Sequence, residues 1–330
     1  MRRIMFVLVF GVSLGLFLQV NPDTLPEKYV KKVIIEAKWG NGPGEFGLEP
    51  IDETYTWQTH LAIDNEGNFY IVDANNCRIN VYNQNGKFIK EIKVPPEFLT
   101  YIGEDTIAVI EGIGVDSKGY IFISRTCKGT KIIKMDKNGK VVDRYFIKGI
   151  YLFPQYFYED KEMYLWGSWS IGFSGVSDYL GDACISLSKI KSLEKGEVLR
   201  EISLLASNTF KVVDKRRRIS TLNLQGINEN EWTINTTAPP APFRVIKKEE
   251  KEYIIYEDWE GYIKINSKKK LLFNEDIRLL NNWAFLHPRL GMMRVSADAL
   301  FDKDGNFYLI KGDPNGFKLI KYIINQEVWK

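Results

Sequence analysis

The side chains best suited to chemistry are oxygen donors that come from distant parts of the chain. Carboxylate and amide oxygens are the ligands that calcium prefers, and a bound calcium ion could polarise a bond for hydrolysis. The candidates are Glu45, Asp73, Asn75, Glu257 and Asp258. Their spacing forms no compact motif, so the sequence supports a calcium-assisted hydrolase only as the alternative function.

A second group of residues could bind a ligand without catalysis. Tryptophan rings stack on sugars and peptides, and histidine or arginine can hydrogen-bond to them. The candidates in this group are Trp57, His60, Arg125, Trp166, Trp169 and Trp259. The chain has two histidines, His60 and His287, so a three-histidine metal site is excluded. We predict no resident metal or other cofactor.

Motifs that mark enzymes are missing from the sequence. It contains no Gly-x-Ser-x-Gly elbow, no phosphate-binding glycine loop and no metal-ligand spacing. The segment from Asp302 begins like a calcium loop, but its glycine, Gly305, is fourth instead of sixth and Asp313 stands at position twelve. We therefore predict a hairpin turn there, and the sequence favours a noncatalytic protein.

The composition limits which partners the protein can bind and which state its cysteines adopt. The 330 residues carry 45 basic and 42 acidic side chains, so no excess charge indicates nucleic acid binding, and 45% hydrophobic residues can bury a large core. Cys77, Cys127 and Cys184 form no CxxC pair and are expected as free thiols, with a Cys77–Cys127 bridge as the alternative.

The stretch from His60 to Ile92 contains a complete four-stranded unit. Strands are predicted at 61–63, 69–72, 78–82 and 88–92, because aromatic and β-branched residues alternate with turn formers. Gly67 supplies the positive φ of the first hairpin, and Asn85-Gly86 marks the outer one. Four antiparallel strands of this length form one propeller blade.

The same unit recurs. Gly119 follows Gly67 by 52 residues, Gly139 follows Gly86 by 53, and a third copy spans 301–310. Such periods are typical of propeller blades with variable loops. Less regular strands are expected at 156–158, 163–165 and 184–190, at 212–213, 219–224 and 232–235, and at 243–246, 253–256, 262–265 and 271–273.

The repeats resemble the NHL-repeat propeller family. The resemblance rests on Lys38-Trp39-Gly40-Asn41-Gly42-Pro43-Gly44-Glu45-Phe46, on Ala62-Ile63-Asp64-x-x-Gly67, and on Val72-Asp73-x-x-Asn76-x-Arg78-Ile79. It covers the first, second and last units and fades between about 151 and 290. It implies an all-β, six-bladed β-propeller of four-stranded antiparallel blades. The strand expected at 29–37 would then join the outer edge of the last blade and close the ring.

The N-terminus predicts export. Met1-Arg2-Arg3 precedes 17 mostly apolar residues, Ile4 to Val20, as in a signal peptide, but no clear cleavage site follows. We assign 1–20 to a signal peptide or an uncleaved anchor, 21–28 to a linker and 29–330 to the propeller domain. The expected location is extracytoplasmic, with membrane contact only through the N-terminal segment if it is retained.

Strand direction predicts the working surface. Loops after the second and fourth strands of each blade share one end of the ring, while the Asp-x-x-Gly and Asn-Gly turns occupy the other. The irregular segments expected at the loop-rich end are 73–77, 125–128, 166–182, 257–260 and 311–315. Binding residues concentrate in loops on a rigid scaffold. The sequence thus favours an extracytoplasmic binding or scaffold propeller whose loop-rich face takes a protein, peptide or glycan; the alternative is a lactonase-like hydrolase with carboxylates at the central channel.

Overall fold

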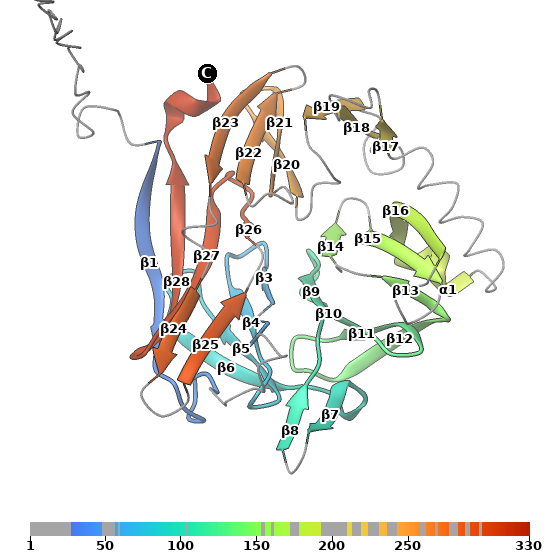
Figure 1. Ribbon diagram of the computed structural model, residues 1–330, viewed down its shortest axis with the longest axis vertical. Helices are drawn as coiled ribbons and strands as arrows, with labels where there is room; N and C mark the ends of the chain where they lie inside the picture. Colours follow the sequence, from blue (N-terminus) through green and yellow to red (C-terminus); the bar gives the residue numbers. More distant parts are fainter. Residues whose placement is uncertain are drawn as a thin grey trace, which may run out of the picture.

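The computed structural model describes residues 28–47, 57–58, 60–102, 105–152, 156–159, 162–171, 178–192, 210–212, 219–223, 231–235, 243–257, 262–267, 270–276, 283–287, 291–296 and 299–330. Small antiparallel sheets dominate this part of the chain and are arranged around a common centre (Figure 1), so the fold is an all-β propeller. The predicted export segment and residues 21–27 of the linker lie outside the described residues.

Four sheets are blades of four strands in linear order. The first blade contains β3 (Leu61–Ile63), β4 (Phe69–Asp73), β5 (Arg78–Tyr82) and β6 (Phe88–Lys93). The second contains β9 (Gly112–Val115), β10 (Ile121–Thr126), β11 (Gly129–Met135) and β12 (Val141–Lys148). A third contains β20 (Phe243–Lys248), β21 (Lys251–Glu257), β22 (Tyr262–Ser267) and β23 (Leu271–Asp276). All three confirm predicted strand groups.

The fourth of these sheets, which we call the terminal blade, joins the two ends of the described chain. It contains β26 (Leu300–Phe301), β27 (Phe307–Asp313), β28 (Gly316–Ile324) and β1 (Tyr29–Ala37). β1 pairs antiparallel with β28, from Tyr29 opposite Ile324 to Ala37 opposite Phe317. The predicted partner of the first ordered strand is therefore the observed one.

The expectation of six four-stranded blades is wrong for the described residues, which form four such blades of linear order. A further sheet is branched: β13 (Ile150–Leu152), β14 (Tyr156–Glu159) and β16 (Asp178–Ser186) all pair with β15 (Met163–Ile171). The loop predicted at 166–182 is wrong over much of its length, because β15 and β16 extend into it. The strand predicted at 184–190 ends at Ser186, and the short helix α1 (Leu187–Ser192) follows.

The remaining sheets have three or two strands among the described residues. β17 (Phe210–Val212), β18 (Ile219–Asn223) and β19 (Glu231–Asn235) form a meander close to the predicted positions. β24 (Trp283–His287) and β25 (Gly291–Ser296) pair with β2 (Trp57–Gln58), and β7 (Leu99–Ile102) pairs with β8 (Asp105–Ala108). The last two sheets were not predicted.

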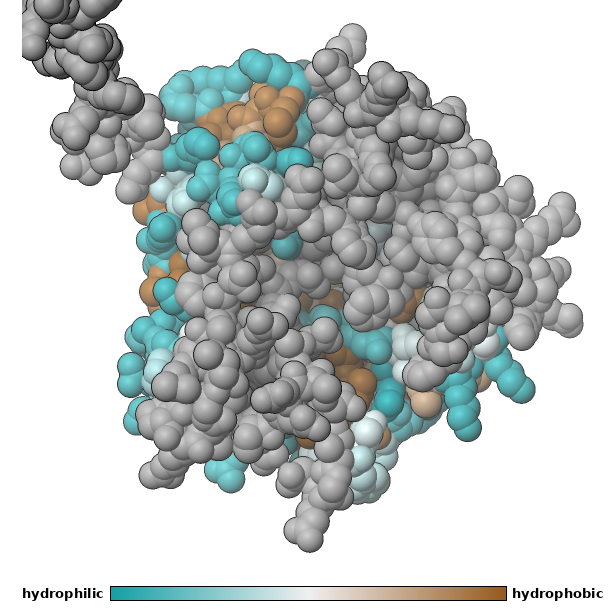
Figure 2. All heavy atoms as spheres, in the orientation of Figure 1, coloured by the Kyte–Doolittle hydropathy of each residue, from teal (hydrophilic) through white to brown (hydrophobic). Residues whose placement is uncertain are grey.

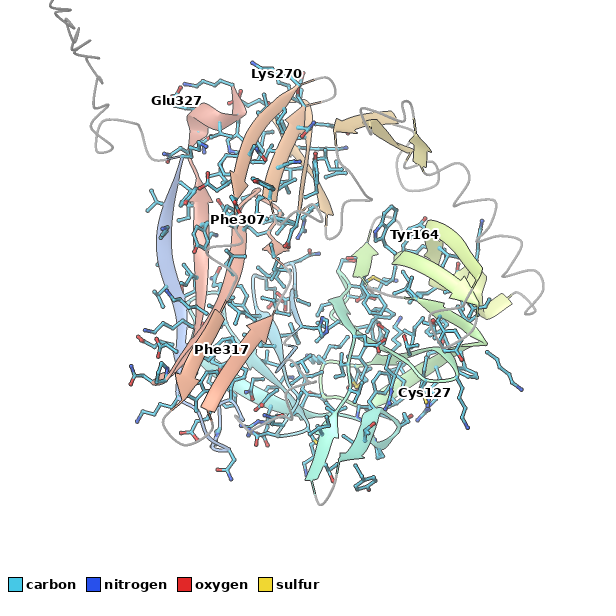
Figure 3. The ribbon with its side chains drawn as sticks, viewed as in Figure 1. Cys127, Tyr164, Lys270, Phe307, Phe317 and Glu327 are labelled. Carbon is cyan, nitrogen blue, oxygen red and sulfur yellow. The ribbon has the colours of Figure 1, made fainter. Side chains whose placement is uncertain are left out.

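Alternating side chains join neighbouring blades into one core. Along β4, Tyr70 and Val72 pack toward the second blade, whereas Phe69 and Ile71 pack toward the terminal blade. The terminal blade does the same: Phe307 belongs to the cluster shared with β20–β23, and Phe317 to the cluster shared with the first blade (Figure 3). Hydrophobic burial between successive sheets therefore fixes their order around the centre.

The Asp-x-x-Gly turns share one hydrogen-bond pattern. In each, the aspartate Oδ1 accepts backbone N–H groups two and four residues later, as for Asp64, Asp116 and Asp302. Asp302 also accepts bonds from Tyr308 Oη at 3.0 Å and Lys321 Nζ at 2.9 Å. These donors and the pairing of β26 with β27 confirm the predicted hairpin turn.

The surface beside β1 carries both hydrophobic and charged side chains. Val30 and Val33 are half exposed among lysines, and Figure 2 shows small hydrophobic patches within a mainly hydrophilic surface on this side. Lysines and a bulge between Val33 and Ile35 are typical of an edge strand protected from unwanted pairing. Within the described ranges, no helix has the length and apolarity needed to span a bilayer.

Candidate functional site

The loop-rich end of the first blade is covered by a segment that we call the lead-in loop, Trp39 to Gly47. It is glycine-rich, so its backbone can approach the blade closely. The Phe46 ring is fully buried against Phe317, with ring centroids 4.1 Å apart. Trp39 Nε1 donates to the carbonyl of Asp313 at 2.7 Å, which ties the loop to the terminal blade.

Arg78, at the start of β5, holds the lead-in loop in place. Its side chain is buried, and its Nε donates to Asp73 Oδ2 at 2.9 Å. Its Nη1 donates to Glu91 Oε2 at 2.7 Å and to a loop carbonyl at 3.1 Å. Its Nη2 donates to the carbonyls of Gly42 and Glu45 at 2.8 and 2.9 Å. Every guanidinium nitrogen of Arg78 thus has an acceptor.

Asp73 is the matching acceptor. Its Oδ1 accepts the Gly47 N–H at 2.9 Å, and its Oδ2 accepts Asn76 Nδ2 at 2.8 Å as well as Arg78. Burial raises the pKa of the Asp73 carboxyl, while these donors oppose the rise. Three of the predicted oxygen donors therefore lie together here, but in a structural network: Asn75 Nδ2 donates to the Gly47 carbonyl, and Glu45 Oε2 accepts the Gly42 N–H.

His60 lies directly before β3, the first strand of the first blade. Its carbonyl accepts the N–H of Val72 at 2.9 Å, which places its backbone in the blade ladder. Its Nε2 is buried and has no hydrogen-bond partner among the described residues. Burial lowers the pKa of His60 to about 4, so the ring is neutral at pH 7.

The second blade presents Arg125 and Glu111 at the same end. Arg125 reaches the β7–β8 hairpin through Thr100 Oγ1 at 3.2 Å and two carbonyls at 3.5 Å, and its buried Nε has no partner among the described residues. Glu111 directly precedes β9, which lies beside β3. Its Oε2 accepts the N–H and Oγ1–H of Thr126 at 2.8 and 2.6 Å, and burial raises the pKa of its carboxyl.

Glu111 and Thr126 were missed by sequence reasoning. The available signal was position: Glu111 immediately precedes the first strand of its blade, as His60 does, and Thr126 ends the second strand in the repeat after Asp73. In the part of the chain that is described, no three His, Cys, Asp or Glu side chains gather as a metal site would require.

The other predicted residues are not gathered at this site. Glu257 Oε2 accepts the Ala299 N–H at 2.8 Å and so links β21 to the terminal blade. Trp166 is only 1% exposed, so the expectation that it stacks on a ligand is wrong: β15 places its ring in the protein interior. Trp57 and Trp169 lie on β2 and β15, and their side chains are outside the described set, as are Asp258 and Trp259 entirely.

The two cysteines whose side chains are described, Cys77 and Cys127, are free thiols. This agrees with the default prediction and not with a bridge between them. Cys77 Sγ lies 3.2 Å from the Thr106 carbonyl, so the thiol contacts the β7–β8 hairpin.

Comparison with known proteins gives a fold-level likeness only. No family model and no curated protein sequence matches the chain. Among solved structures, streptogramin B lyase is 12% identical with a TM-score of 0.41, over 90% of this chain and 98% of that one. The PQQ-bound aldose sugar dehydrogenase of Streptomyces coelicolor is 11% identical with a TM-score of 0.38, over 91% and 99%. A candidate exported protein of Bacteroides fragilis is 10% identical with a TM-score of 0.40, over 90% and 96%.

These similarities are too low to carry an argument about function. The NHL resemblance also stays a prediction, because no family match supports it.

Proposed function

We propose that the protein is an extracytoplasmic, noncatalytic binding propeller whose loop-rich end takes a protein, peptide or glycan. One observation carries this proposal. At that end the carboxylates of Asp73, Glu111 and Glu257 accept hydrogen bonds from their own chain, whereas His60 Nε2 and Arg125 Nε lack partners among the described residues.

The energetics of hydrogen bonding support a ligand here. A buried polar group without a partner costs roughly 1–3 kcal/mol, and a ligand that supplies the partner recovers this cost. Neutral His60 and cationic Arg125 together suit a polar ligand with carbonyl or hydroxyl oxygens, as peptides and glycans have. The carboxylates are already engaged by donors, which disfavours the calcium-assisted hydrolase.

Export, the number of blades and the closure of the ring are inferred from the sequence and from the order of the sheets. The basic start and the apolar run at 4–20 support export. Six blades would result if the branched sheet β13–β16 and the meander β17–β19 each count as one, between the second blade and β20–β23. The pairing of β1 with β28 would then close that ring.

The test compares the full chain with its His60→Gln variant on arrays of defined glycans and synthetic peptides. Binding that weakens at least tenfold in the variant supports the proposal. Calcium chloride and EDTA are added in a parallel thermal unfolding series. A midpoint raised by calcium, together with calcium-dependent lactone hydrolysis, would overturn the proposal in favour of the hydrolase.

A further inference from the structure

The β11–β12 hairpin forms the outer edge of the second blade. The strands of this blade run outward from the centre in the order β9, β10, β11 and β12 (Figure 1), and among the described residues β12 pairs only with β11. The register of the pair is unbroken from Gly129 opposite Lys148 to Lys134 opposite Asp143. The outer side of β12 therefore has backbone groups that no other strand of the described chain engages.

The edge strand of the terminal blade differs in this respect. β1 is interrupted by a bulge between Val33 and Ile35, which is a device that discourages pairing with another strand. In the β11–β12 pair the register shift lies beside the turn, between Lys134 and Met135. The rest of β12 is a regular strand with a free edge.

The two faces of β12 have different environments. On one face, Tyr145 and Ile147 pack in the hydrophobic cluster that also contains residues of α1 and of the branched sheet. Alternate residues of a strand share a face, so the remaining positions form the second face. This face is exposed and carries apolar and cationic side chains in turn: Val142, Arg144, Phe146 and Lys148. Val142 and Phe146 are each 52% exposed.

The hairpin is strongly basic. Residues 128–148 include seven basic and two acidic side chains. The acidic ones, Asp136 and Asp143, already accept backbone N–H groups of their own turn or strand. Arg144 pairs with Glu97 at 3.0 Å, but none of the six lysines forms an ion pair within the part of the protein that is described. The exposed face of β12 therefore lies in a region with excess positive charge.

Neighbouring strands add lysines to the same region. Lys131 on β11 lies directly opposite Phe146. Lys90 on β6 of the first blade donates to the backbone carbonyl of Lys137, in the turn before β12. Burial lowers the pKa of Lys90, and the charge of Lys137 lowers it further. Because like charges this close repel each other, a negatively charged partner stabilises the region.

We propose that β12 binds an extended, acidic segment of a partner protein, in which acidic and apolar residues alternate, as an added strand. Its acidic side chains face Arg144 and Lys148, and its apolar side chains cover Val142 and Phe146. Pairs of opposite charge and of apolar side chains on neighbouring strands stabilise a sheet, and the added strand supplies main-chain hydrogen bonds. This surface is the outer edge of a blade, so the inference goes beyond the ligand proposed for His60.

The experiment measures fluorescence polarisation of three labelled octapeptides with the full chain. One alternates glutamate with valine, one alternates lysine with valine, and one has its glutamates in one block and its valines in another. We expect the alternating glutamate peptide to bind at least tenfold more tightly than either of the others. Phe146→Ala and Lys148→Glu should each weaken its binding at least fivefold, and His60→Gln should leave it unchanged.

The matched controls lie on the outer hairpin of the first blade. Ile89→Ala removes a side chain that is 49% exposed on β6, and Lys87→Glu reverses an exposed charge in the equivalent turn. Both should leave binding unchanged, and thermal midpoints establish that all variants fold.

Several results would overturn the inference. They are equal binding of the alternating and block peptides, no peptide binding, or equal losses in the β12 variants and the controls. Dextran sulfate that binds through Lys148 when the peptides do not would identify a polysaccharide surface instead. Peptide binding that is lost in His60→Gln would place the peptide at the loop-rich end, so this inference would fail while the proposed function stands.

Discussion

The first and second blades have the same strand pattern but differ in the hydrogen bonds that an arginine makes at the loop-rich end. In the first blade, Arg78 is buried and all its nitrogens have acceptors in Asp73, Glu91 and the lead-in loop. In the second blade, Arg125 makes three longer contacts and its Nε has no partner among the described residues. A repeated scaffold can thus use one arginine to fix a loop through all of its nitrogens and another, one blade away, to contact the β7–β8 hairpin through only some of them.

The largest expected effect comes from removing the buried cation of the first blade. Arg78→Met should lower the free energy of unfolding by about 3–5 kcal/mol, because Asp73 stays buried without its partner and the lead-in carbonyls lose their donors. Urea denaturation of the full chain at pH 7 measures the change. A loss below about 1 kcal/mol would mean that the lead-in loop does not depend on Arg78.

The second effect is a pH dependence from His60. Its pKa in the folded protein, about 4, lies below the ordinary value of 6.5, so acid favours the unfolded chain, which binds the proton more readily. Its full contribution to stability is present above pH 6.5 and is lost as the pH falls through 4, on the order of 3 kcal/mol in total.

His60→Gln should remove this part of the pH dependence, as measured by urea denaturation between pH 4 and 7. His287→Gln, which alters the other histidine of the sequence, serves as the control and should retain it. Identical pH profiles for wild type and His60→Gln would show that the imidazole is not buried in its neutral form.

The third test compares the outer turns of the two blades. Gly86 and Gly139 occupy equivalent positions with φ near +80° and +86°. A Cβ at Gly86 would lie 1.7 Å from the backbone oxygen of Ile34 in β1, whereas at Gly139 it would meet only the Ile92 side chain at 2.5 Å. Gly86→Ala should therefore cost about 2 kcal/mol more than Gly139→Ala, beyond the ~1–2 kcal/mol of a left-handed alanine. Thermal or urea unfolding of the two variants decides this, and equal losses would argue against the β1 contact.

The smallest effect is expected for the arginine of the second blade. Arg125→Met should change the free energy of unfolding by about 1 kcal/mol or less, since its contacts are long and its charge only partly opposes the burial that raises the pKa of Glu111. Hydrogen exchange at Thr100 should become faster, because the hairpin loses a contact at its base. A stability loss as large as that of Arg78→Met would remove the contrast between the two blades.

Sequence reasoning succeeded where local turn chemistry dictates the chain path. The strands predicted at 61–63, 69–72, 78–82 and 88–92 match β3 to β6 within a residue at each end. Gly67 and Gly86 adopt the positive φ that their hairpins require. Such turns specify their own geometry, so no distant contact is needed to predict them.

Sequence reasoning failed where contacts between residues far apart in the sequence determine the structure. The segment Trp166 to Asp182 is rich in glycine and serine and was predicted as a loop, yet Trp166 pairs with Cys184 and with Tyr156 across β15. The candidate site shows the same limit. Asp73 and Asn75 were predicted as ligand-binding residues from their loop position, but the lead-in loop, about 30 residues earlier, occupies their hydrogen-bonding groups.

The amino-acid sequence by itself determined the repeating hairpins, because alternating apolar residues and glycine turns act over a few residues. Only the tertiary structure decided which polar groups have hydrogen-bond partners and which lack them among the described residues. Burial and hydrogen-bond partners come from segments far apart in the chain: Arg78 meets carbonyls more than 30 residues away, while His60 Nε2 meets none in the described protein.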